Sequence, residues 1–407
     1  MLASYRNDLK PIADLAQSFA ARELAGKTGE HDRYPFGEFY DHVLHKAHEA
    51  GFLSAILPES PGGTGSDIGG GPGGNIGGDI GGSPAGNIGG GIAALCEILI
   101  HICETDASPG GIIFTQALSQ KLLLAAGAWN LTQISPPEAS SAAASVKDLL
   151  IACPAYTNPA QTDSLPLAQK TGSDYNLTGR LELLVLGNLA RQAIIPARFG
   201  IGPSYSFFLV DLDDQNVKKS EPVFTLGLHA CPAVDVTFSS APARLIGEEN
   251  AGHQYFEKVS PEMNAAAAVM NAGILRGVYN EAVAYSQNRE QGGKPIINWS
   301  EIGMMLASIL VKADVAAMCV CQSCLELEQK KSGYETRVSA AALHIAELSC
   351  DATSDGIQIL GGYGYMKDYG QEKRYRDARM VQALLGAVPF KKLDIIRQAT
   401  NTNPNNV

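Results

Sequence analysis

The chain has 407 residues, of which 45% are hydrophobic and 18% charged, so it is long enough to bury two or three hydrophobic cores. Its formal net charge of −11 argues against nucleic acid and anionic membrane surfaces as partners. The N-terminus lacks the apolar segment of a signal peptide, and the runs "IAALCEILIHIC" and "NAAAAVMNAGIL" are too short or too polar to span a bilayer. We therefore expect a soluble cytoplasmic protein.

Residues 1–148 are predicted to form an N-terminal helical domain. The segments "SYRNDLKPIADLAQSFAARELAG" and "YPFGEFYDHVLHKAHEAGFL" carry apolar residues at helical spacing, and each runs into a glycine that ends a helix. A glycine-rich insertion at 62–91 interrupts this pattern. The segments "IAALCEILIHICETD" and "IIFTQALSQKLLLAAGA" then resume the helical period.

The glycine-rich insertion contains nearly the same twelve residues twice, between Asp67 and Gly90. A phosphate-binding loop lies between a strand and a helix with glycines at fixed offsets, whereas this block follows a helix and lacks the Lys-Ser/Thr ending. We interpret it as a tolerated surface insertion, because lengthening a loop costs only about 0.6 kcal/mol per doubling. The alternative is that it reshapes a pocket or clasps a partner. Deleting 79–90 is predicted to leave folding intact.

Residues 149–250 change to short β-rich segments, which are "LLIACPAYT", "YNLTGRLELLVLG", "QAIIPARFG", "YSFFLVDLD" and "AVDVTFSSAPARLIG". Long helical patterns return over 251–400. Helices, a small β-domain and more helices predict an α+β fold rather than a βαβ alternation.

Three cysteines are close enough in sequence to suggest a metal site: Cys319, Cys321 and Cys324. A structural zinc or iron–sulfur site needs about four ligands, usually on loops. Because these cysteines lie inside a strong helical pattern, we expect buried helix cysteines and no metal.

The segment "QILGGYGYMKDYGQEKRYRDAR", residues 358–379, resembles the C-terminal signature of the acyl-CoA dehydrogenase family. "NREQGGKPI" resembles the family's Arg-x-x-Phe-Gly-Lys segment, and "AYTNPAQTD" resembles its flavin loop imperfectly. The resemblance covers nearly the whole chain. It implies an N-terminal helical domain, a middle β-barrel or sheet domain and a C-terminal four-helix bundle, assembled into dimers or tetramers. It also implies FAD, an acyl-CoA substrate and α,β-desaturation of the thioester, with a carboxylate removing the α-proton.

The chain departs from the family where the resemblance implies the redox chemistry. An ungapped count places Leu385 at the usual catalytic glutamate. Leu183 and Val185 stand where the family has a tryptophan beside the flavin and a threonine near its N5. Of the residues that the resemblance assigns to this half of the flavin site, only Thr157 still has a polar side chain.

The other half of the family's flavin site comes from a neighbouring subunit, and here that half is retained. Arg289 and the Gln358-x-x-Gly361-Gly362 turn stand where the family holds the pyrophosphate and adenosine of a neighbour's flavin, and only a phenylalanine is replaced, by Gly292. A guanidinium can pair with pyrophosphate, and glycine lets the backbone approach it.

This asymmetry leads to three hypotheses. The first is a partner-supporting subunit of a hetero-oligomeric acyl-CoA dehydrogenase, whose base lies on another, homologous chain. The second is a homo-oligomeric enzyme that uses Glu262 as a relocated base, although the chain has Asn264 where the family has a CoA-contacting arginine, and Glu262 after Pro261 also suits the first turn of a helix. The third is a flavin-free scaffold. The resemblance also implies electron-transferring flavoprotein as a candidate partner.

Overall fold

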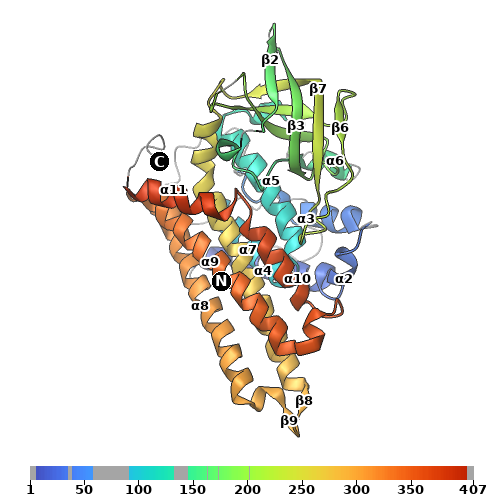
Figure 1. Ribbon diagram of the computed structural model, residues 1–407, viewed down its shortest axis with the longest axis vertical. Coiled ribbons are helices and arrows are strands. Elements are labelled where there is room, and N and C mark those ends of the chain that lie inside the picture. Colours follow the sequence, from blue (N-terminus) through green and yellow to red (C-terminus); the bar gives the residue numbers. More distant parts are fainter. Residues whose placement is uncertain are drawn as a thin grey trace.

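The computed structural model describes residues 6–34, 39–57, 91–132, 145–162, 164–172, 174–200 and 202–400. Its elements follow one another as a first group of helices, one sheet and a second group of helices (Figure 1). The predicted α+β order of helical domain, β-domain and helical bundle is confirmed. Most of the glycine-rich insertion, including the segment 79–90, lies outside the described residues.

Two long helices form the centre of the N-terminal group. The first, α4, is apolar along nearly its whole length, and the second, α5, starts at the N-cap Asp106, whose carboxylate accepts a hydrogen bond from the Ser108 N–H. Both helices are buried on most sides, as expected for helices that are apolar all round. The helices of this group are α1 (Lys10–Phe19), α2 (Thr28–His31), α3 (His45–Glu49), α4 (Gly91–Thr105), α5 (Ala107–Ala125) and α6 (Val146–Leu149).

The strands between the two helical groups form one mixed sheet. Its order is β1-β4-β5-β7-β3-β2, with β6 also paired to β7, and every pairing is antiparallel except that of β1 with β4. Its strands are β1 (Ile151–Ala152), β2 (Leu167–Thr171), β3 (Asp174–Val185), β4 (Gln192–Ala197), β5 (Ser206–Asp211), β6 (Val217–Lys219) and β7 (Ala233–Ile246).

The C-terminal group is built on α7, which at 1.5 Å per residue is about 55 Å long. Figure 1 shows α7, α8 and α9 running side by side away from the sheet, with the hairpin β8-β9 at their far end. The elements of this group are α7 (Gly252–Asn288), β8 (Glu290–Gln291), β9 (Lys294–Pro295), α8 (Ser300–Gln329), α9 (Tyr334–Leu360), α10 (Gln371–Gln382) and α11 (Val388–Thr400).

Among the described helices, α8 alone is long and apolar enough to cross a membrane, with a mean hydropathy of 1.9 over its most apolar 18 residues. A helix of a soluble bundle can satisfy the same criterion, and one side of α8 packs against α7 and α9. Only 28% of that window is buried, however, so α8 leaves an apolar face uncovered.

Candidate functional site

A groove of about 500 Å³ lies beside the hairpin β8-β9, and Figure 1 shows this hairpin at the end of the bundle farthest from the sheet. The end of α7, the hairpin β8-β9, the start of α8 and the end of α9 surround it. Four residues singled out from the sequence line this one groove: Arg289, Gln358, Gly361 and Gly362.

The ends of two long helices position these four residues. Arg289 follows the last residue of α7 and has an extended backbone, which turns the chain into the hairpin. Gly361 follows the last residue of α9 with a φ of +58°, a conformation that favours glycine. A side chain added at Gly361 or Gly362 would meet no atom within 4 Å, so the backbone of this turn is open to the groove.

The charge of Arg289 is available inside the groove. Its guanidinium lies 5.7 Å from the centre of the Tyr363 ring, and within the described part of the chain no carboxylate forms an ion pair with it. Burial raises the pKa of Tyr285, and the nearby Arg289 charge opposes that shift. The groove therefore combines one unpaired cation, a glycine turn and aromatic side chains, which suits a phosphate-bearing ligand with a ring system.

Thr157 lies in a different part of the molecule. It follows β1, and its loop is next to Gly386, where an added side chain would approach Asn158 and Gln161. The helix α10, about 18 Å long, separates this loop from the groove, because Tyr369 before α10 contacts Tyr285 and Leu385 after α10 donates to the Ala155 carbonyl. Thr157 and Arg289 thus do not line one pocket of the same chain.

The three positions that the resemblance assigns to redox residues are apolar and closely packed. Leu385 is buried, has a φ of +63°, and donates its N–H to the Ala155 carbonyl at 2.7 Å. Val185 is also buried and exchanges backbone hydrogen bonds with Cys153. Leu183 has a φ of +55° and donates its N–H to Asp235. The side chains of Leu385, Val185 and Leu183 can neither accept a proton nor donate a hydrogen bond to a flavin ring.

Glu262 is held by a cation. Its Oε2 lies 2.5 Å from Lys121 Nζ, and both side chains are largely buried between α7 and α5. The expectation that Glu262 suits the first turn of a helix is wrong, because Pro261 and Glu262 lie inside α7, which begins at Gly252. Asn264, two residues further along α7, donates to Ser339 Oγ at 3.3 Å.

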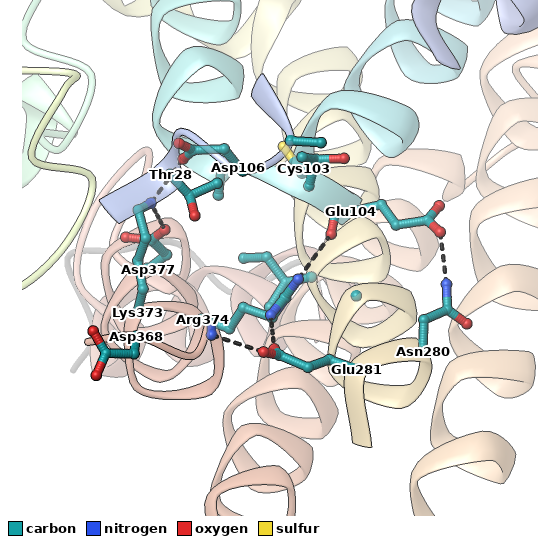
Figure 2. Close-up of a pocket in the computed structure, with 17 residues that line it drawn as sticks. Thr28, Cys103, Glu104, Asp106, Asn280, Glu281, Asp368, Lys373, Arg374 and Asp377 are labelled. Carbon is teal, nitrogen blue, oxygen red and sulfur yellow. Dashed lines mark hydrogen bonds and ion pairs between the residues drawn. The ribbon is translucent and has the colours of Figure 1, made fainter. Parts of the chain in front are cut away.

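A second pocket, of about 370 Å³, lies where α4, α5, α7 and α10 meet near the start of α2. Figure 2 shows the Lys373 ammonium beside Asp106 and Asp377, at 2.7 and 2.6 Å. Burial alone would lower the pKa of Lys373, but the two carboxylates raise it above its usual value. Arg374 is paired with Glu281 in the same way. Because each of these charged side chains has an oppositely charged partner within the chain, we interpret the pocket as a polar contact between helices rather than a ligand site.

The same segment also ties the bundle to the N-terminal helices. Arg376 pairs with Asp32 at 2.7 Å, and His229 Nδ1 lies 3.0 Å from the same carboxylate. Burial alone would raise the pKa of Asp32, but His229 and Arg376 lower it to about 2. The sequence analysis did not predict these ion pairs. The spacing of four residues between Lys373 and Asp377 in α10 nevertheless favours an ion pair on one face of a helix.

Three cysteines in α8 differ in burial, since Cys324 is buried and Cys319 and Cys321 are partly exposed. Over the described residues, no group of three or more His, Cys, Asp or Glu side chains is arranged to hold a metal ion.

Known proteins resemble this chain over nearly its full length. Residues 250–399 match the family model described as "Acyl-CoA dehydrogenase, C-terminal domain". The caffeyl-CoA reductase-Etf complex subunit CarC of Acetobacterium woodii is 25% identical over 95% of this chain and 96% of its own. The 3-(aryl)acrylate reductase of Clostridium sporogenes is 25% identical over 94% of this chain and 96% of its own. The structure of butyryl-CoA dehydrogenase from Megasphaera elsdenii covers 97% of this chain and 98% of its own, with a TM-score of 0.77 at 19% identity.

Proposed function

Since the chain is a divergent member of the acyl-CoA dehydrogenase family, we propose that it supports the flavin site of a homologous subunit in FAD-dependent α,β-dehydrogenation of an acyl-CoA thioester. One observation carries this proposal. Arg289 and the Gly361-Gly362 turn face an open groove, whereas Leu385, at the position of the family's base, is buried and apolar.

The groove fits the diphosphate half of the cofactor. The unpaired Arg289 guanidinium would bind the pyrophosphate, and the exposed backbone of Gly361 and Gly362 would approach its oxygens without a side chain in between. FAD, when bound, would supply the acceptor for the hydride from the β-carbon. The contribution of this chain is to hold and orient the cofactor.

The residues around Leu385 do not fit the other half of the cofactor. Removing a weakly acidic α-proton needs a base, and Leu385, Leu183 and Val185 provide none. Thr157 is the one polar side chain at the positions where the family contacts the flavin ring. We therefore assign the base to a homologous chain and derive no proton transfer in the pocket of this chain.

A helix surface supports assembly with another subunit. Met304, Val311, Met318 and Leu325 follow one another at intervals of seven residues along α8, and their side chains are 67%, 61%, 62% and 47% exposed. A seven-residue interval keeps apolar side chains on one face of a helix and is typical of a helix that packs against another. We name these four residues the α8 stripe.

The named relatives extend the proposal to the electron carrier. CarC is named as a subunit of a caffeyl-CoA reductase-Etf complex, so we infer that an electron-transferring flavoprotein also exchanges electrons with the assembly proposed here. The proposed setting is the cytoplasm, with an acyl-CoA as substrate.

The rival hypothesis of a homo-oligomeric enzyme depends on Glu262. A carboxylate held 2.5 Å from Lys121 would have to leave that ion pair before it could accept an α-proton. No observation in the groove favours that hypothesis, but the experiment below includes it.

The test is to purify the chain alone and together with a homologous subunit that retains the glutamate, tryptophan and threonine absent here. We expect a colourless protein alone, a yellow complex after co-purification, and bleaching of the complex by an acyl-CoA. Arg289→Ala should strip flavin from the complex, and Arg289→Lys should retain part of it.

Other outcomes contradict the proposal. A yellow homo-oligomer that an acyl-CoA bleaches, and that Glu262→Gln inactivates, would establish the relocated base. Protein that remains colourless in both preparations would establish the scaffold.

A further inference from the structure

The segment that joins α9 to α10 forms one wall of the groove. It comprises residues 361–370, and we name it the α9–α10 connection. Gly361, Gly362 and Tyr363, at its start, line the groove. Gly370, at its end, lines the second pocket instead. The position of the groove wall therefore depends on what holds the far end of this connection.

One carboxylate on α7 holds that end. Glu281 Oε1 accepts the Gly370 N–H at 2.8 Å, and Oε2 of the same side chain accepts from Nη1 of Arg374, in the first turn of α10. Figure 2 shows the Glu281 and Arg374 side chains meeting in this contact. The two side chains are only 24% and 17% exposed. A single, largely buried carboxylate thus fixes both the connection and the start of α10 to α7.

The packing around this ion pair leaves little room for another arrangement. A side chain carbon added at Gly370 would collide with Nη1 of Arg374, and one added at Gly277 on α7 would lie 2.6 Å from its Nε. Nη2 of Arg374 also donates to the Glu104 carbonyl near the end of α4, at 3.5 Å. The guanidinium is therefore enclosed by α7, by the end of α4 and by the connection, and close packing restricts its position.

One side of α7 leads from this ion pair to the groove. Glu281, Tyr285 and Arg289 follow one another at intervals of four residues, which places them on the same side of the helix end. The centre of the Tyr285 ring lies 5.8 Å from that of Tyr369 and 6.3 Å from that of Tyr363. Tyr363 in turn lies beside the Arg289 guanidinium. If the connection moved away from α7, Tyr363 and the glycine turn before it would move away from Arg289.

We propose that Glu281 and Arg374 are positioning residues for the groove, which set the separation between Arg289 and the glycine turn at the value that a diphosphate needs. This inference rests on the proposed function and adds the contact that controls ligand affinity there. Binding groups that are already in place lose less conformational freedom when the ligand arrives, so a fixed wall raises affinity. Glu281 and Arg374 line the second pocket and not the groove, so their effect passes through the wall.

The test measures binding of inorganic pyrophosphate to the purified chain by calorimetry. Glu281→Ala and Arg374→Met should each weaken binding roughly tenfold. Glu281→Gln should lose only about threefold, because its amide oxygen can still accept the Gly370 N–H. Arg276→Met is the matched control, since Arg276 on the same helix forms a partly buried ion pair with Glu104 rather than with the connection. It should leave the affinity within about twofold of the parent.

A double-mutant cycle separates positioning from a general loss of stability. In an Arg289→Lys background, Glu281→Ala should cost less than about threefold in affinity, because a flexible ammonium can follow a displaced wall and a rigid guanidinium cannot. The same tenfold loss in both backgrounds would contradict the positioning role. Circular dichroism and urea unfolding check that each variant is folded under the conditions of the titration.

Failure of this inference differs from failure of the proposed function. If Arg289→Ala weakens pyrophosphate binding but Glu281→Ala and Arg374→Met do not, the groove assignment stands and the positioning role is wrong. If Arg276→Met weakens binding as much as Arg374→Met, the effect belongs to the bundle as a whole, and the positioning role is again wrong. If the parent protein binds no pyrophosphate at millimolar concentration, the groove assignment fails as well.

Discussion

Lys373 illustrates how a residue within a family signature can serve the fold instead of the chemistry. It is buried and bridges Asp106, the N-cap of α5, to Asp377 on α10. The sequence identified the segment by resemblance, but not this partner, because Asp106 is 267 residues away and only the folded chain brings the two together.

Removing the Lys373 charge should destabilise the protein strongly. Lys373→Met leaves two buried carboxylates without a cation, and breaking such an ion pair costs about 3–5 kcal/mol. Lys312→Met is the matched control, because the Lys312–Asp355 pair is partly exposed and contributes about 1 kcal/mol or less. Urea unfolding measures both variants. Equal losses of unfolding free energy would contradict the structural role of Lys373.

At the scale of elements, α7 and α4 approach closely at a glycine. A side chain carbon at Gly273 would lie 2.6 Å from the Ile100 carbonyl oxygen and 2.9 Å from Cβ of Cys103. The backbones of the two helices can therefore pack together only because residue 273 has no side chain. Gly303, on α8, has no atom within 4 Å of the same position.

Substituting alanine at these two glycines should have opposite effects. Gly273→Ala forces α4 and α7 apart and should cost about 1–3 kcal/mol of unfolding free energy. Gly303→Ala should stabilise by up to about 1 kcal/mol, because alanine favours the helix and reduces the freedom of the unfolded chain. Thermal and urea unfolding check both. If Gly273→Ala left the unfolding free energy unchanged, α4 and α7 could move apart at no cost in stability, and the close contact at residue 273 would not matter.

The elements that were predicted well are those whose pattern is local. Helical spacing predicted the long helices that became α7, α8 and α9, and short β-rich segments predicted the sheet. The prediction that Glu262 lies in the first turn of a helix was wrong. Proline at residue 261 favours a helix start there, whereas α7 begins earlier and continues through Pro261. The contact of Glu262 with Lys121 on α5 could not be read from spacing along the chain.

In the folded chain, four residues singled out through family resemblance line one groove, but the resemblance did not indicate the aromatic side chains beside them. Trp299 reaches the groove only because the hairpin folds back over Gly292, which no spacing rule implies. The α8 stripe was missed for a related reason. A helix that is apolar on several sides looks like a core helix until its neighbours are known, and here only part of it is covered.

The α8 stripe leads to a prediction about assembly. If a homologous subunit packs on it, a charge placed there would be buried without a partner, which is unfavourable by several kcal/mol. Met318→Glu should therefore weaken association of this chain with the homologous subunit more than tenfold in Kd, while the unfolding free energy of the isolated chain changes little, because Met318 is exposed.

The control for this prediction is the same charge on the β-domain. Gln215→Glu adds a carboxylate at an exposed residue between β5 and β6, and it should leave association unchanged. Light scattering and analytical ultracentrifugation of the co-purified complex measure both variants. If Met318→Glu dissociates nothing, the partner must contact another surface, and the exposed methionines of α8 are then unrelated to assembly. If Met318→Glu dissociates the complex and also releases the flavin, then subunit contact along α8 and retention of the cofactor at the groove depend on one interface. This result is expected when two chains complete one site.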